Sequence, residues 1–459
     1  MFKKEISVVI LAAGKGSRMK SNYPKVLHSL GGKTILEHVI KTAQSIKPRK
    51  IILVYNGEKK NILSKIYDIS IEWVIQEKPE GTGHAILLAS KKFSDNENIL
   101  VLYGDVPLIS IESIKKLENS KKQSTISLLT MKVKNPNGYG RIIRTKGKIS
   151  GIVEEQDANS KQKKIKEIYS GIFIANGKDL KRWLGKINNK NSKKEFYATD
   201  IISLAYLEGN FIQTIQPLKY QEILGVNNKM QLSILEKILQ QEQINRLLIA
   251  GVTLKDPSHF VLRGTLKHGK NVEIDTAVIL EDNVFLGNNV KIGAGCIIKN
   301  SIINDNTNIE AYTIIENAKI GKNCIIGPFA HLRINTLLDE EVQIGNFVEI
   351  KDTIIKTQSK VKHLSYLGDS EIGSKVNIGA GSITCNYDGI NKFKTIIGDN
   401  VLVGSNTQLV APIKIIKNTT IAAGTTLMKD VNTSSCLVYN TKEQRYKKNW
   451  IRPNKIDQK

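Results

Sequence analysis

The 459-residue chain is too long for one ordinary hydrophobic core, so its length predicts at least two domains. Its 41% hydrophobic and 24% charged residues are typical of a soluble globular protein. The sequence has no run of eighteen apolar residues, which disfavours a membrane protein. It also shows no cleavable leader pattern, so we expect a cytoplasmic protein. The net charge of +25 would permit nucleic-acid binding, but the lysines are spread along the whole chain and aromatic residues make up only 6%, which disfavours a base-stacking surface.

The first element is a continuous apolar run, Ile6 to Leu11, which predicts a parallel strand buried on both faces. It leads into the small residues Ala12, Ala13 and Gly14, whose backbone N–H groups can approach a phosphate or the edge of a base. The loop is neither a dinucleotide fingerprint nor a P-loop, because the third Gly and the Gly-Lys-Ser/Thr ending are missing. Arg18 and Lys25 follow closely, and two cations behind such a loop favour a polyanion such as a nucleoside triphosphate.

Further α/β units follow, with a helix predicted at 35–45 and strands at 51–55 and 99–103. Gly104 and Asp105 come directly after the last of these strands. A carboxylate at the carboxyl end of a parallel strand lies where open α/β sheets bind ligands, and Asp is a natural Mg²⁺ ligand beside phosphates. Gln76 and the Gly81-Thr82-Gly83 loop lie between the strands; alone, such a loop is usually only the start of a helix.

After Asn228 the pattern becomes helical up to residue 250, and from Ile274 to Thr426 an aliphatic residue recurs about every six positions. A six-residue period fits neither a helix nor an alternating strand, but it is typical of coils stacked into a parallel β-helix. We therefore divide the chain into residues 1–227, a linker helix at 228–250, and a β-helix at 251–459. The four cysteines, Cys296, Cys324, Cys385 and Cys436, have no paired spacing and are predicted to be reduced thiols.

Five motifs occur in order: Leu-Ala-Ala-Gly-x-Gly-Ser-Arg-Met, Pro-Lys-Val-Leu, Gln76, Gly-Thr-Gly-His-Ala and Tyr-Gly-Asp-Val-Pro-Leu. With the hexad region behind them, the sequence resembles the bacterial bifunctional N-acetylglucosamine-1-phosphate uridyltransferase / glucosamine-1-phosphate N-acetyltransferase family. The resemblance covers nearly the full length. It implies an α/β nucleotidyltransferase (Rossmann-like) domain followed by a left-handed parallel β-helix of hexapeptide repeats. It also implies a cytoplasmic homotrimer with UTP, glucosamine 1-phosphate and acetyl-CoA as substrates, Mg²⁺ as cofactor, and no nucleic-acid or membrane partner.

In the first domain, the resemblance implies a site for nucleotide and amino sugar. Arg18 and Lys25 would act catalytically on the triphosphate, and Asp105 and Asn227 would bind Mg²⁺. The implied nucleotide- and sugar-binding residues are Leu11, Ala12, Ala13, Gly14, Lys25, Gln76, Gly81, Thr82, Tyr103, Gly104, Asp105, Gly140, Glu154, Tyr169 and Asn227. Tyr169 stands where the family usually has Asn, and it can still offer a hydroxyl group.

In the second domain, the resemblance implies acetyl transfer with His363 as general base and Glu349 orienting its imidazole, which titrates near neutral pH. The implied residues for glucosamine 1-phosphate are Arg333, Lys351, Tyr366, Asn377 and Lys392. Those for acetyl-CoA are Ala380, Asn386, Tyr387, Ser405, Ala423 and Asn440. Asn440 replaces an Arg that reaches a CoA phosphate in the family, and Lys442 or Arg445 are candidates to compensate.

Two alternatives remain open. One is a sugar-1-phosphate nucleotidyltransferase whose β-helix is not catalytic, against which the set around His363 and Asn386 argues, because a scaffold would not need it. The other is a scaffold or nucleic-acid-binding protein that uses the positive charge. Arg18, Lys25 and Asp105, in their nucleotidyltransferase context, argue against that one.

Overall fold

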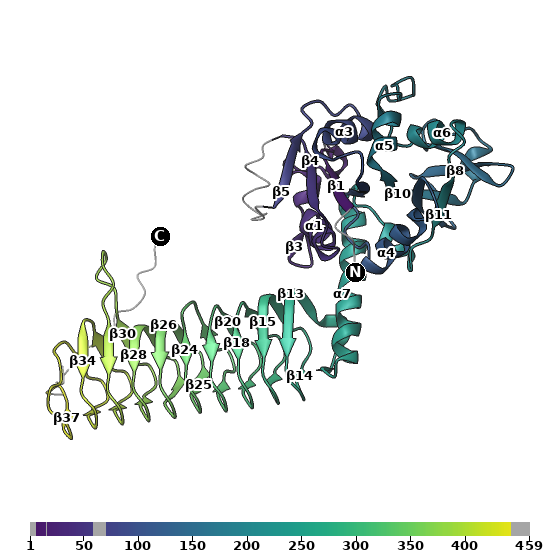
Figure 1. Ribbon diagram of the computed structural model, residues 1–459. Coiled ribbons are helices and arrows are strands. Elements are labelled where there is room, and N and C mark those ends of the chain that lie inside the picture. The colour runs from purple at the N-terminus through teal and green to yellow at the C-terminus, as the bar shows by residue number, and fades with distance from the viewer. Residues whose placement is uncertain (1–5, 15, 58–69, 442–459) are drawn as a thin grey trace, which may run out of the picture. The chain divides into compact units, whose positions relative to one another are not determined.

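The computed structural model describes residues 6–14, 16–57 and 70–441 (Figure 1). The chain forms two compact units, Met1–Gln243 and Ile244–Lys459. The boundary between them falls within helix α7 (Lys229–Ile249), which matches the helix predicted from residue 228 to 250. The helix ends just before Gly251, whose φ of 92° is the left-handed conformation common after a helix.

Unit 1 is built on a mostly parallel sheet. The order of its main strands is β11 (Ile212–Ile215), β7 (Ile126–Lys132), β10 (Glu167–Asn176), β6 (Asn98–Tyr103), β1 (Ile6–Ala12), β4 (Lys50–Tyr55) and β5 (Ile71–Ile75). Strand β10 runs antiparallel to both neighbours, and the hairpin of β8 (Gly140–Thr145) and β9 (Lys148–Val153) joins it through β8. A short pair, β2 (Ser29–Leu30) and β3 (Lys33–Thr34), lies apart.

Helices cover both faces of this sheet, because side chains alternate along β1. Val8 and Ile10 belong to the core shared with α1 (Ile35–Ser45) and α4 (Ile111–Lys121). Val9 and Leu11 belong to the core shared with α3 (Thr82–Ala89), α5 (Gly177–Leu184) and α6 (Asp200–Leu207). The prediction of a first strand buried on both faces is confirmed, and its carboxyl end opens toward the loop that follows.

Unit 2 is a parallel β-helix in which each strand pairs with the strand one coil later (Figure 1). One face, called face A here, is the sheet β12 (Thr253–Leu254), β14 (Glu273–Ile274), β16 (Lys291–Ile292), β19 (Asn308–Ile309), β22 (Ile325–Ile326), β25 (Gln343–Asn346), β27 (Lys360–His363), β29 (Asn377–Ile378), β32 (Leu402–Val403), β35 (Thr420–Ile421) and β37 (Leu437–Val438).

The other two faces, called B and C, share one larger sheet, because several strands continue around the bend between them. It contains β13 (Val261–His268), β15 (Ile279–Leu286), β17 (Ile297–Lys299), β18 (Ile302–Ile303), β20 (Ile314–Glu316), β21 (Lys319–Ile320), β23 (His331–Leu332), β24 (Leu337–Leu338), β26 (Glu349–Ile355), β28 (Tyr366–Ile372), β30 (Ile383–Cys385), β31 (Thr395–Ile397), β33 (Gln408–Val410), β34 (Ile413–Ile415) and β36 (Thr426–Leu427). Face B holds the first half of each coil in this sheet, such as Glu349–Lys351, and face C holds the second half, such as Ile354–Ile355.

The six-residue pattern is confirmed, since every aliphatic residue that the sequence assigns to it from Ile274 to Ile421 is at most 3% exposed. Ile303 and Leu338 also belong to this core, although the predicted pattern does not include them. Ile303 follows Ile298 by five residues because one bend of that coil is shorter, whereas Leu338 keeps the six-residue spacing between Leu332 and Ile344. The bend between faces C and A uses left-handed residues, for which Asn is well suited. Asn271, Asn289 and Asn306 occupy it with φ of 55° to 58°, and their amides form a ladder with 2.9 Å steps.

Two further expectations concern the whole chain. Cys296 and Cys324 are buried free thiols, and Cys385 and Cys436 are partly exposed free thiols. Among the described residues, no helix has both the length and the apolar character needed to cross a bilayer.

Candidate active sites

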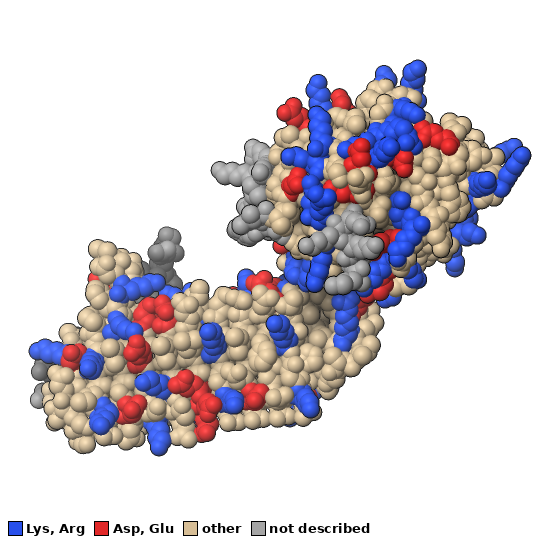
Figure 2. Space-filling model, viewed as in Figure 1, with Lys and Arg blue, Asp and Glu red and all other residues tan. Residues whose placement is uncertain are grey.

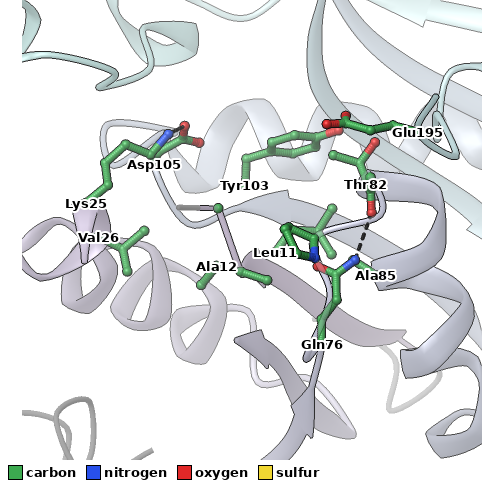
Figure 3. Close-up of a pocket in the computed structure, with 14 residues that line it drawn as sticks. Leu11, Ala12, Lys25, Val26, Gln76, Thr82, Ala85, Tyr103, Asp105 and Glu195 are labelled. Carbon is green, nitrogen blue, oxygen red and sulfur yellow. Dashed lines mark hydrogen bonds and ion pairs between the residues drawn. The ribbon is translucent and has the colours of Figure 1, made fainter. Parts of the chain in front are cut away.

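A cavity of about 460 Å³ opens at the carboxyl end of β1 and β6 in unit 1 (Figure 3). Its lining residues are Leu11, Ala12, Ala13, Gly14, Lys25, Val26, Gln76, Pro79, Gly81, Thr82, Ala85, Tyr103, Asp105 and Glu195. Most were singled out from the sequence. Val26, Pro79, Ala85 and Glu195 were missed, and Glu195 belongs to no recognisable motif because it reaches the cavity from a loop far along the chain.

Two glycines at this cavity lie where a side chain would meet close neighbours. Gly81 has a φ of 108°, and a Cβ there would lie 2.5 Å from the backbone oxygen of Phe196. Gly104 lies behind the lining, where its N–H donates to the Leu11 oxygen at 2.9 Å and a Cβ would lie 3.1 Å from both the Leu11 oxygen and the Ala12 Cβ. These residues shape the site through their backbone, which explains why it depends on small residue types.

Gln76 is a buried polar side chain at one end of the cavity. Its Nε2 donates to the Gly81 oxygen at 3.0 Å and lies 3.3 Å from the His84 Nδ1 atom. The amide nitrogen is therefore held by the protein, which leaves Oε1 as the atom able to accept a hydrogen bond from a base. Uracil offers such a donor at N3, where cytosine offers an acceptor.

A cluster of cations and oxygen ligands occupies the other end. Figure 3 shows the Lys25 amine and the Asp105 carboxylate pointing toward each other, and the two form a close ion pair. Lys25 Nζ also donates to Asn227 Oδ1 at 3.2 Å, and Arg18 Nη2 donates to the same oxygen at 3.0 Å. A carboxylate and an amide oxygen that converge on one ammonium can also converge on one Mg²⁺, which prefers hard oxygen ligands and completes its shell with water and phosphate. The described residues contain no cluster of three or more His, Cys, Asp or Glu side chains for a metal, so these two ligands would need such completion.

The residues predicted to contact the amino sugar gather around Glu154. Its Oε1 accepts from Thr199 Oγ1 at 3.1 Å, and a Cβ on Gly140 would lie 3.7 Å from its Oε2. Burial raises the pKa of the Glu154 carboxyl, and burial together with the Glu154 charge raises the pKa of Tyr103. Tyr169 is buried, and its hydroxyl donates to the Gly171 oxygen at 2.8 Å instead of facing an incoming sugar.

His363 in unit 2 belongs to a column of residues at the bend between faces A and B. Successive bends are tied by backbone bonds from Leu364 to Asn346 at 3.1 Å, from Gly381 to His363 at 3.4 Å and from Asn406 to Ala380 at 2.7 Å. Gly424 donates in the same way to Ser405 at 2.8 Å, and the pairing of Ile421 with Val438 continues the register. The column therefore contains Asn346, His363, Ala380, Ser405, Ala423 and Asn440, which aligns four of the acetyl-CoA candidates with the candidate base.

The ring partner of His363 differs from the sequence-based expectation. His363 Nδ1 lies 3.2 Å from Asn346 Oδ1, because β25 and β27 are paired in register at these two residues. Glu349 begins β26 on face B and forms an ion pair with Arg333 at 2.6 Å. In the structure, the ring of His363 therefore contacts an amide oxygen one coil away, and the Glu349 carboxylate is paired with Arg333.

The residues predicted to hold glucosamine 1-phosphate are spread around the bend. Arg333 and Lys351 follow the paired residues Leu332 and Ile350 on face B, where Tyr366 pairs with Glu349. Asn377 lies on face A. Lys392 belongs to the excursion that follows β30; this segment is closed by a bridge with Tyr387, and Lys392 lines a separate cavity of about 620 Å³.

The remaining acetyl-CoA candidates are held by contacts within the chain. Asn386 forms a close hydrogen bond with Asp369, and the Tyr387 hydroxyl donates to the Gly389 oxygen at 2.5 Å. Asn440 Nδ2 donates to the Thr426 oxygen at 3.4 Å, so the residue that replaces the family's Arg contacts its own coil. Lys442 and Arg445 lie outside the described residues.

Comparisons with known proteins address both units. Residues 8–143 match the model of the MobA-like NTP transferase domain, residues 262–346 that of the GMPPB C-terminal domain, and residues 394–429 that of the hexapeptide repeat of succinyl-transferase. Among solved structures, a UDP-glucose pyrophosphorylase complexed with UDP-glucose is 17% identical and covers 51% of this chain and 98% of its own, with a TM-score of 0.43.

The chain also matches curated proteins along its whole length. It is 77% identical to the bifunctional protein GlmU of Buchnera aphidicola subsp. Acyrthosiphon pisum (strain Tuc7), with all of both chains covered. It is 72% identical to the bifunctional protein GlmU of Buchnera aphidicola subsp. Schizaphis graminum (strain Sg), with 100% of this chain and 99% of that protein covered. The chain therefore belongs to the family of the bifunctional protein GlmU, in which a nucleotidyltransferase unit is joined to a hexapeptide-repeat acyltransferase unit.

Proposed function

We propose that the chain carries out the last two steps of UDP-N-acetylglucosamine synthesis. The β-helix acetylates glucosamine 1-phosphate with acetyl-CoA, and unit 1 then transfers UMP from UTP to the product and releases pyrophosphate. The observation that carries this is the cavity in which the Leu11–Gly14 loop, Gln76, Lys25 and Asp105 meet. Such a site offers an acceptor for the base at one end and a cation with metal ligands for the phosphates at the other.

In uridylyl transfer, an oxygen of the sugar phosphate attacks the α-phosphorus of UTP, and the bond to pyrophosphate breaks. Gln76 Oε1 would accept from uracil N3, and the Leu11–Gly14 backbone would lie along the nucleotide. Lys25 and Arg18 would offset the negative charge that develops on the phosphates. Mg²⁺ bound by Asp105 and Asn227 would add further charge stabilisation.

In acetyl transfer, the amine of glucosamine 1-phosphate attacks the thioester carbonyl, the C–S bond breaks and CoA leaves. The amine must first lose a proton, which His363 accepts. If Nδ1–H of His363 donates to Asn346 Oδ1, the Nε2 lone pair is free to act as the base. Arg333 and Lys351, on adjacent coils of face B, would hold the sugar phosphate.

We further propose that the acetyl site is completed by another copy in a homotrimer. Asn377 on face A, His363 at the bend and Tyr366 on face B lie around a convex edge, and a convex edge exposes its ligands on one side to water. A ligand pocket buries most of its ligand, so a second surface is needed to cover this one. Mixing a His363→Ala protein with a Lys392→Ala protein, after dissociation and reassembly, should restore part of the acetyl transfer if copies share sites. No restoration would mean that each chain acts alone.

The decisive assay supplies glucosamine 1-phosphate, acetyl-CoA, UTP and Mg²⁺ and follows CoA and pyrophosphate separately. Release of both supports the proposal. If pyrophosphate is released only when N-acetylglucosamine 1-phosphate is added, and no CoA is released, the alternative with a non-catalytic β-helix is favoured.

A nucleic-acid role is less well supported, because Figure 2 shows Lys and Arg interspersed with Asp and Glu on the visible face of the β-helix. We also place the enzyme in the cytoplasm, where its nucleotide and thioester substrates are found.

A further inference from the structure

The Lys25 ammonium occupies the position between the two oxygen ligands proposed for Mg²⁺. Its Nζ is in close contact with Asp105 Oδ2 and lies 3.2 Å from Asn227 Oδ1. The side chains of Lys25 and Asp105 are only 12% and 18% exposed, so water screens this contact little. The segments that meet here lie far apart in the chain, since Lys25 and Asn227 are 202 residues apart.

A divalent cation bound to the same two oxygens cannot coexist with the ammonium. Mg²⁺ requires ligand distances of about 2.0–2.1 Å, and a second positive charge in contact with the same oxygens would repel it. Lysine has a flexible four-carbon stem and can move to another partner. Lys25 lines the same cavity as the Leu11–Gly14 loop, so phosphates of a bound nucleotide lie within its reach.

We infer that Lys25 is an internal competitor of the metal: it holds Asp105 and Asn227 in position without nucleotide and is released to the triphosphate when the metal enters. This inference rests on the proposed uridylyl transfer. It makes binding of metal and nucleotide mutually supportive, because a bound triphosphate gives the displaced ammonium a new anionic partner. Metal alone must bind at the expense of the Lys25 contacts.

Binding of Mn²⁺ to the full-length, nucleotide-free protein tests this, with free Mn²⁺ measured by electron paramagnetic resonance. Lys25→Met removes the charge at similar length and should bind Mn²⁺ about 10-fold more tightly than the unmodified protein, since a charged hydrogen-bonded contact no longer has to be broken. With a UTP analogue whose α–β bridge is a methylene group, the gain should disappear, because the unmodified protein then has phosphate to receive Lys25. Lys25→Gln should show the same direction, and it replaces the Met variant if that one does not fold.

Two controls locate the effect. Arg18→Met removes a cation that contacts Asn227 but not Asp105, and it should change nucleotide-free Mn²⁺ affinity less than Lys25→Met does. Asp105→Asn in the Lys25→Met background should abolish the gain. Equal or weaker Mn²⁺ binding by folded Lys25→Met and Lys25→Gln proteins would overturn the inference. Pyrophosphate release by the unmodified protein is measured in parallel. If the unmodified protein releases pyrophosphate but the Lys25 variants show no gain in Mn²⁺ affinity, the inference fails and the proposed function stands.

Discussion

Substitutions of His363 and of its neighbour Asn346 should lower the rate of CoA release by different amounts, and this difference tests the proposed acetyl transfer. In the structure, the Nδ1 atom of His363 lies 3.2 Å from the Asn346 Oδ1 atom. His363→Ala removes the base itself, and a positioned imidazole contributes about 10²–10⁴-fold to such a step. CoA release should therefore fall by that order.

Asn346→Ala removes only the contact that fixes the ring. A neutral hydrogen bond at an exposed side chain contributes about 1 kcal/mol or less, which corresponds to a loss of about 5-fold or less in rate. Asn346→Asp is the matched variant, because it keeps an oxygen acceptor and adds a charge that favours protonated imidazole. It should move the rate–pH profile of CoA release toward higher pH while keeping the ring oriented.

The assay follows CoA release with a thiol reagent, and pyrophosphate release from supplied N-acetylglucosamine 1-phosphate reports the other unit in the same sample. Pyrophosphate release should be unchanged in all three variants. Normal CoA release by a folded His363→Ala protein would refute the assignment of the base. A loss for Asn346→Ala as large as that for His363→Ala would refute the orienting role and indicate a structural one.

Three further outcomes are expected from unit 1. Asp105→Ala should lower pyrophosphate release about 10²-fold or more and leave CoA release intact; a parallel loss of both would contradict independent sites. Gln76→Ala should reduce the preference for UTP over CTP about 3- to 10-fold, measured as a ratio of kcat/KM, and an unchanged ratio would assign base recognition to the backbone. Burial raises the Glu154 pKa above its ordinary 4.5, so the neutral carboxyl contributes stability that is fully present below pH 4.5 and is lost as pH rises through the folded-state pKa. Glu154→Gln should therefore have a higher Tm than the unmodified protein at pH 7 and an equal one at pH 4, and a lower Tm at pH 7 would show that the carboxylate is stabilising.

The sequence determined the architecture because the signals involved are local. A run of apolar residues at positions 6–11 identifies a buried strand, and one aliphatic residue in six identifies the β-helix, whatever the rest of the chain does. Ile303 lies outside the strict period because a bend with one residue fewer shifts the spacing without changing the fold. The loop motifs likewise identified most of the residues that line the cavity of unit 1.

Only the tertiary structure decided which side chains form hydrogen bonds with one another. The contact of Lys25 with Asn227, the choice of Asn346 over Glu349 beside His363, and the hydroxyl of Tyr169 on the Gly171 oxygen follow from strand register and burial. Motif spacing gives the chemistry a residue can perform. The partner of that residue depends on which strand ends and bends the folded backbone brings within hydrogen-bond distance. A buried polar group forms a hydrogen bond with a nearby partner because a buried group without one destabilises the fold.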